Sequence, residues 1–413
     1  MSNSSNGMEI AGVSKFTVID VSILFLLILT SGFIVTNDIV SSVMTIGLWL
    51  LLAVFLLIGI NALEKSTIIV FGALALCMSI STVVNNESLW TLSIRIFSFF
   101  VVLCAVNTWS FLEFKQRYIH VMMILAVASL IGFSLLSCIP GLSNLFVVQN
   151  KANYLYSNWI IYVHAKEYSR NMGLFWEPGA FQTFLCLALL FEVLSKHMSI
   201  KRILVFTITV ITTFSTTGYM AMAIILLFAL VNKNTNKNNK KIIAVMILIA
   251  IIMTLFFWDE LLDTSTNSPF GKLVSYANDK NAAEKKVTST SVRINGIIQP
   301  FYAFLSRPIW GFGYEGLNAY TYVYTHNMNT CTFVNWFAVY GIGYGLTMLY
   351  CFYRLAKKST TSFFQLIIVI LVLFTITASE NYVDNPFFAM LAIYGASYNV
   401  GESRYAYCKH QLL

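Results

Sequence analysis

Apolar runs separated by short polar stretches recur along the whole chain. A helix needs roughly 20 mostly apolar residues to cross the hydrocarbon core of a bilayer, and the pattern gives about twelve candidate segments. We expect these spans at residues 16–35, 39–60, 66–84, 91–109, 118–139, 179–194, 203–214, 219–231, 242–258, 331–353, 363–379 and 387–400. The pattern therefore predicts one all-α integral membrane domain covering residues 1–413.

Composition supports a membrane protein. Apolar residues make up 58% of the 413 residues and charged residues only 11%. A soluble chain of this length has no interior large enough to bury that much apolar surface. The seven cysteines are scattered singly, so we expect packing residues rather than a disulfide framework or a metal site.

The basic residues predict an orientation. Lysines and arginines between the spans concentrate in alternate loops, and this bias marks the cytoplasmic side. They are Lys65, Lys115, Arg117, Lys196, Lys201, Arg202, Lys233, Lys237, Lys240, Lys241, Arg354, Lys357 and Lys358, with Arg404 and Lys409 in the tail. We therefore expect both termini in the cytoplasm and the long segments 140–178 and 259–330 on the outer face. The net charge of +8 reflects this topology, and no nucleic-acid partner is expected.

The second outer segment carries the densest candidate chemistry. Arg293 begins a stretch that predicts an interfacial helix, which Arg307 and Pro308 end before a Trp-Gly-Phe-Gly turn, and His326-Asn327 follow. Arginine binds phosphate through a planar fork of donors, and imidazole titrates near neutral pH. The alternative interpretation is that each arginine is an interfacial anchor and His326 is structural.

The first outer segment ends in a second candidate group. Arg170 and Glu177 precede Pro178-Gly179, where the chain re-enters the membrane. Proline is well placed at the start of a helix, and a carboxylate is favourable there. Arg170 either binds an anionic ligand with help from Glu177, or the two side chains form an interfacial pair.

Several further residues are weaker candidates. Arg95 lies one turn inside the fourth span and adds positive potential to the outer face, while Asp20 and Glu192 are interpreted as interfacial groups at cytoplasmic ends. Sugar contacts are expected from aromatic and acidic residues at the outer face, namely Trp176, Trp310, Tyr314, Tyr320, Glu380 and Asp384. The chain has no P-loop, no DxD-like triad and no HExxH, so we expect chemistry without a metal or another cofactor.

Three stretches resemble the bacterial O-antigen polymerase (Wzy-type) and O-antigen ligase superfamily. They are RNMGLFWEPGAF at 170–181, FSTTGYMAMAII at 214–225, and the pattern of two arginines, RPIWGFGYEG and His-Asn within 293–327. The family frequently has an arginine after the short seventh span, where this chain has Gly218 and Tyr219. That departure leaves Arg170 as the candidate that replaces it.

The resemblance implies a polysaccharide polymerase. Such an enzyme is a GT-C-like, metal-independent glycosyltransferase of the bacterial inner membrane, with two large periplasmic loops and an active site facing the periplasm. It transfers a growing glycan from undecaprenyl diphosphate onto the non-reducing end of a new lipid-linked repeat unit, beside a flippase and a chain-length regulator. By this resemblance, His326 or Glu177 is the base, and the diphosphate is bound by Arg170, Arg293, Arg307, Asn327 and Tyr219.

Two other functions stay open. An O-antigen ligase has the same fold and donor but transfers the glycan to lipid A–core. A transporter or flippase for lipid-linked sugars also has about twelve spans, although it usually lacks so long an outer loop. The Glu-Pro-Gly element at 177–179 favours the polymerase.

Overall fold

The structure is a computed structural model of the chain. It describes residues 18–33, 42–60, 62–149, 155–159, 162–165, 170–195, 198–232, 235–256, 289–325 and 329–398. The predicted base His326 and the predicted binding residue Asn327 lie outside these ranges.

Helices dominate this part of the chain. They are α1 (Val18–Gly32), α2 (Ser42–Gly59), α3 (Lys65–Val84), α4 (Leu89–Thr108), α5 (Phe111–Cys138), α6 (Pro178–Val193), α7 (Ile200–Thr212), α8 (Thr216–Val231), α9 (Lys237–Phe256), α12 (Ser289–Ser306), α13 (Tyr314–Thr325), α14 (Thr332–Ser359), α15 (Phe363–Thr377) and α16 (Pro386–Ala396). Among the described residues, α3, α4 and α5 are long and apolar enough to cross a membrane, which supports a membrane-embedded protein. The number of spans and their orientation stay predictions.

Polar side chains that cap helices place the starts of α5 and α9 before the predicted spans. The helix α5 begins at Phe111 because Ser110 and Glu113 form a capping box there, seven residues before the expected span. The basic run 232–241 separates two predicted spans, and its second half is helical. The helix α9 already begins at Lys237, where the Asn236 side chain accepts a hydrogen bond from the Asn239 amide at 2.7 Å.

The segment between α5 and α6 corrects the all-α prediction. It contains the 3-10 turn η2 (Pro140–Asn144) and an antiparallel sheet of β1 (Val147–Gln149), β2 (Leu155–Asn158) and β3 (Val163–Ala165), in the order β1-β2-β3. Strands of three or four residues are too short to leave a clear alternating pattern in the sequence. The Val163 amide donates to the Gly173 carbonyl at 2.8 Å, which joins the sheet to the chain that enters α6.

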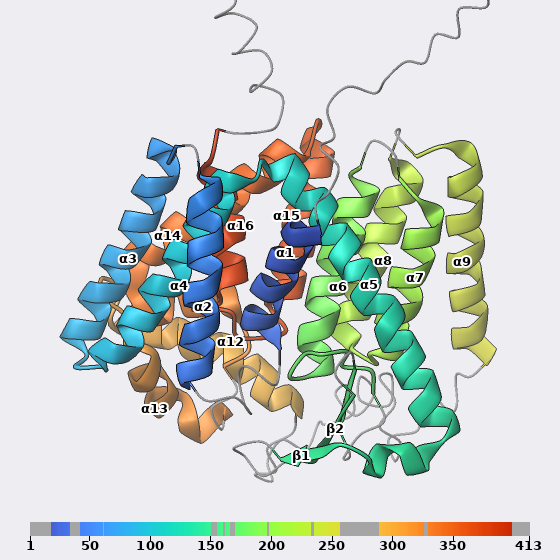
Figure 1. The fold of residues 1–413 in the computed structure, drawn as a ribbon, viewed down its shortest axis with the longest axis horizontal. Coiled ribbons are helices and arrows are strands. Elements are labelled where there is room, and N and C mark those ends of the chain that lie inside the picture. The colour runs from blue at the N-terminus through green and yellow to red at the C-terminus, as the bar shows by residue number, and fades with distance from the viewer. Residues whose placement is uncertain are drawn as a thin grey trace, which may run out of the picture.

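The sheet, α12 and α13 lie together at one end of the helix bundle, which we call the sheet end (Figure 1). Three turns between helices lie at this end. In the α3–α4 turn, Asn85 accepts from Arg307, and at the end of α7 the Thr212 carbonyl accepts from the Asn171 amide. In the α15–α16 turn, Asp384 pairs with Arg95. At the opposite end Arg117 pairs with Asp20 at 3.3 Å, and Arg202 pairs with Glu192 at 3.0 Å. Glu192, expected at the interface, is fully buried.

The helix α14 is broken at Gly341, which has φ 79° and ψ −178°. The turn 308–313 fills the break, because Phe312 N donates to Ala338 O at 2.8 Å, Gly313 N to Val339 O at 3.0 Å and Ile342 N to Pro308 O at 2.8 Å. Irregular backbone within a membrane protein is tolerated where protein groups satisfy its hydrogen bonds. The break therefore fixes the α12–α13 turn against α14 and α3.

Candidate functional site

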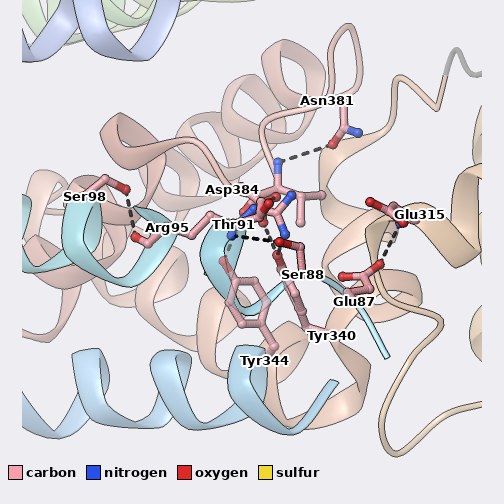
Figure 2. A network of polar contacts seen from close by, with 11 residues as sticks. Glu87, Ser88, Thr91, Arg95, Ser98, Glu315, Tyr340, Tyr344, Asn381 and Asp384 are labelled. Atoms are coloured by element: carbon pink, nitrogen blue, oxygen red, sulfur yellow. Dashed lines mark hydrogen bonds and ion pairs between the residues drawn. The ribbon is translucent and has the colours of Figure 1, made fainter. Parts of the chain in front are cut away.

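An ion pair lies at the sheet end between α4 and the loop before α16. The Nε of Arg95 is 2.9 Å from an Asp384 carboxylate oxygen, and both side chains are 17% exposed. The Tyr340 hydroxyl donates to the other carboxylate oxygen and accepts from Arg95 Nη1 at 3.3 Å (Figure 2). Two charges and a hydroxyl from three separate parts of the chain therefore form one connected group.

Local structure positions each member of this group. The helix α4 starts at a Ser88 cap, which places Arg95 about two turns inside the helix. Asp384 directly precedes Asn385, whose side chain caps α16 by accepting from Phe387 N at 3.0 Å. Tyr340 is the last residue before the Gly341 break. Helix ends and the break thus direct all three side chains to one point.

The ion pair lines a cavity of about 520 Å³, within the usual size range of ligand pockets. Residues from α1, α2, α4, the chain before α6, α13 and the 381–386 loop surround it. They are Thr30, Ser31, Trp49, Ile94, Arg95, Ser98, Trp176, Tyr314, Asn381, Val383, Asp384, Asn385 and Pro386. Three of the predicted sugar contacts, Trp176, Tyr314 and Asp384, are among them, so the structure brings these together.

The α3–α4 turn is hydrogen-bonded to the start of α13, the helix that begins at Tyr314. A Glu87 carboxylate oxygen accepts a hydrogen bond from the Glu315 amide at 2.7 Å, at the positive N-terminus of α13. Burial raises the pKa of the Glu87 carboxyl above its ordinary value, although this hydrogen bond opposes the shift. The Arg95 guanidinium lies 5.1 Å from the centre of the Tyr314 ring, a cation–π distance.

The predicted base Glu177 lies beside the cavity at the start of α6. It is the N-cap residue, Pro178 follows at the first helical position as expected, and the Trp176 indole donates to Glu177 Oε1 at 3.3 Å. Glu380 is 8% exposed and packs on Gly179, where an added Cβ would lie 2.2 Å from Glu380 Oε1. Trp176, Glu177 and Glu380 therefore occupy one neighbourhood.

The predicted pair Arg170 and Tyr219 lies at the α7–α8 turn. Arg170 donates from Nε to Thr213 O at 3.0 Å and from Nη2 to Phe214 O at 2.8 Å. Tyr219 is within electrostatic range of Arg170, and its hydroxyl donates to Ile211 O at 2.7 Å. The arginine thus binds carbonyl groups at the end of α7, and a pair between Arg170 and Glu177 stays a prediction.

Other predicted residues lie elsewhere. Arg307 is exposed, donates to Asn85 Oδ1 at 3.3 Å and stacks 4.6 Å above the Phe312 ring. Trp310 is 46% exposed and does not line the cavity. The helix predicted from Arg293 to Ser306 is present within α12, and its interfacial position stays a prediction. The Arg293 side chain is outside the described part.

The residues at the centre of the candidate site are the ones that the sequence indicates least clearly. Arg95 and Asp384 were weak candidates, while Tyr340, Glu87 and Asn381 were not candidates at all. An arginine within an apolar span was the available signal, because a charge in that setting is usually paired or functional. Across the described residues, no cluster of three metal-ligating side chains occurs.

A family model described as O-antigen ligase matches residues 203–342. The match confirms the resemblance to the O-antigen polymerase and ligase superfamily, and it runs from α7 to the break in α14. No protein in the curated set and no solved structure matches the chain.

Proposed function

We propose, from the O-antigen ligase match over residues 203–342, that the chain is a polysaccharide polymerase. It would transfer a growing glycan from undecaprenyl diphosphate to the non-reducing end of a new lipid-linked repeat unit, at the periplasmic face of the inner membrane. The observation that carries the proposal is that the matched segment supplies Tyr314 to the lining of the cavity and Tyr340 to the Arg95–Asp384 ion pair that lines it.

The reaction needs a stabilised leaving group and a base. The acceptor hydroxyl oxygen attacks the anomeric carbon of the donor glycan, and the bond from that carbon to the diphosphate oxygen breaks. The diphosphate leaves with the bonding electrons, and fixed arginines such as Arg170, Arg293 and Arg307 stabilise its charge. Glu177 or His326 takes the hydroxyl proton. No step in this scheme requires a metal.

Deleting the gene is expected to shorten the glycan ladder. A polymerase defect leaves single repeat units on the lipopolysaccharide core, because one unit is still attached but none is extended. Electrophoresis of lipopolysaccharide beside extracted lipid-linked intermediates measures this result. An unchanged ladder would contradict any role in glycan transfer.

A ligase is the second candidate, favoured by the match to the O-antigen ligase family over residues 203–342. It predicts a different result in the same deletion. Long chains would accumulate on undecaprenyl diphosphate, and the core would carry no glycan. The Glu177-Pro178-Gly179 element at the start of α6 is the feature that led us to prefer the polymerase.

Replacing Arg170 with alanine is expected to slow chain extension about tenfold, the effect of losing one charge-assisted contact to the diphosphate. Arg170→Lys should recover only part of the rate, because lysine lacks the planar fork that reaches both Thr213 O and Phe214 O. Glycan length per unit of membrane-inserted protein is the measurement. Wild-type length in Arg170→Ala would remove Arg170 from the diphosphate site.

A further inference from the structure

The cavity at the sheet end is polar but electrically balanced. Among the described residues that line it, Arg95 and Asp384 carry the only charges, and they neutralise each other across 2.9 Å. The remaining polar side chains in the lining are uncharged hydroxyls and amides, namely Thr30, Ser31, Ser98, Tyr314, Asn381 and Asn385, together with the indoles. A ligand that enters this cavity therefore lies next to the dipole of the Arg95–Asp384 pair and not next to a net positive charge.

Such a lining disfavours a diphosphate. An incoming phosphate oxygen can bind Arg95 only while facing the Asp384 carboxylate, and like charges at that range repel strongly in a partly buried site. A sugar hydroxyl has no such conflict, because it can accept from the guanidinium and donate to the carboxylate. Two of the five N–H groups of Arg95 are engaged by Asp384 and Tyr340, and the carboxylate has spare lone pairs.

Two further groups in the wall are suited to a sugar ring. Trp176 is half-buried, and its indole nitrogen is held by Glu177, so its ring presents a fixed apolar face. Ser31 is 3% exposed, and its hydroxyl has no hydrogen-bond partner among the described residues. Buried hydroxyls are normally paired, and a ligand hydroxyl in the cavity would satisfy this one.

We propose that the Arg95–Asp384 cavity binds an uncharged sugar ring of the glycan substrate, and that the lipid diphosphate is held outside it by cations such as Arg170. The assignment rests on the proposed glycan transfer. It divides the substrate between two places: the ring packs on Trp176 with its hydroxyls on the ion pair, next to Glu177, and the charged group remains at the α7–α8 turn.

Ligand competition in the full-length protein tests this division. The protein in lipid nanodiscs is mixed with the methyl glycosides of glucose, galactose and N-acetylglucosamine, and binding is followed by saturation-transfer NMR. Methylenediphosphonate is then added as a stable diphosphate. In the wild type, at least one glycoside is expected to bind, and the diphosphonate should not displace it.

The variant Asp384→Asn should reverse this selectivity. It keeps the size of the side chain but leaves the Arg95 charge unmatched, so the diphosphonate should now displace the glycoside. Asp20→Asn is the matched control, because it removes the carboxylate from the Arg117 pair at the opposite end of the bundle. That variant should behave as the wild type.

The aromatic face has its own test. Trp176→Ala should weaken glycoside binding about tenfold, whereas Trp310→Ala, at an exposed tryptophan outside the cavity, should leave it unchanged. Displacement of the glycoside by diphosphonate in the wild type would overturn the proposal, as would the absence of any glycoside signal that depends on Trp176. Because binding is measured without transfer, glycoside binding in a protein that extends no glycan would refute the polymerase and retain the sugar site.

Discussion

Replacing Arg95 with alanine is expected to abolish glycan extension, with a loss of at least about a hundredfold in rate. The change leaves the Asp384 carboxylate without its cation in a site that is only 17% exposed. Removing one partner of a buried pair typically costs about 3–5 kcal/mol. The Tyr314 ring also loses the guanidinium that packs on it. Ladder length and the amount of folded protein in the membrane are measured together.

A double variant separates the function of this pair from its contribution to stability. Arg95→Gln with Asp384→Asn removes both charges and keeps the side-chain sizes, so the melting temperature should return close to the wild-type value while extension stays absent. Recovery of wild-type ladders in the double variant would show that the pair is needed only for folding. Arg117→Ala, which breaks the pair with Asp20 at the opposite end, should retain extension per folded molecule.

Replacing Gly341 with alanine is expected to give the largest loss of stability, about 3 kcal/mol or more. A Cβ there would lie 2.0 Å from the Ile309 carbonyl oxygen, and the φ of 79° with an extended ψ suits only glycine. The substitution must separate the 308–313 turn from α14, which breaks three backbone hydrogen bonds. Thermal unfolding of the detergent-purified protein measures the loss.

Gly72→Ala in α3 is the matched control for that experiment. Nothing lies within 4 Å of a Cβ built at Gly72, and alanine is the better helix former by about 1 kcal/mol. Its melting temperature should be unchanged or slightly higher. Equal melting temperatures for Gly341→Ala and the wild type would mean that the break in α14 contributes little to stability.

The helices were the most predictable part of this fold. Long apolar runs gave α6 and α15 nearly at their observed bounds, because burial in a membrane or core imposes a continuous signal. The break at Gly341 was not predicted. It depends on the 308–313 turn packing into α14, and glycines with positive φ at Gly311 and Gly313 look like ordinary turn residues until that partner is known.

The site was predictable only in part. Trp176, Glu177 and Tyr314 were candidates because they stand in the two long polar segments between apolar runs, and the structure places Trp176 and Tyr314 in the cavity wall. Asp384 and Tyr340 were undervalued or missed, since each becomes important through Arg95, and a pairing across such sequence distance leaves no local pattern. Glu87 was missed for the same reason, because its partner is the backbone of α13.

The distance in sequence between Arg95 and Asp384 also has a consequence for biosynthesis. The chain grows from its N-terminus, so α4 is made with its arginine long before the ribosome reaches the loop that precedes α16. Through most of translation, that guanidinium lacks the carboxylate that neutralises it in the finished protein. A chain cut short before Asp384 would therefore hold this arginine in an apolar helix without its ion-pair partner, and such unpaired charges in apolar helices are unfavourable.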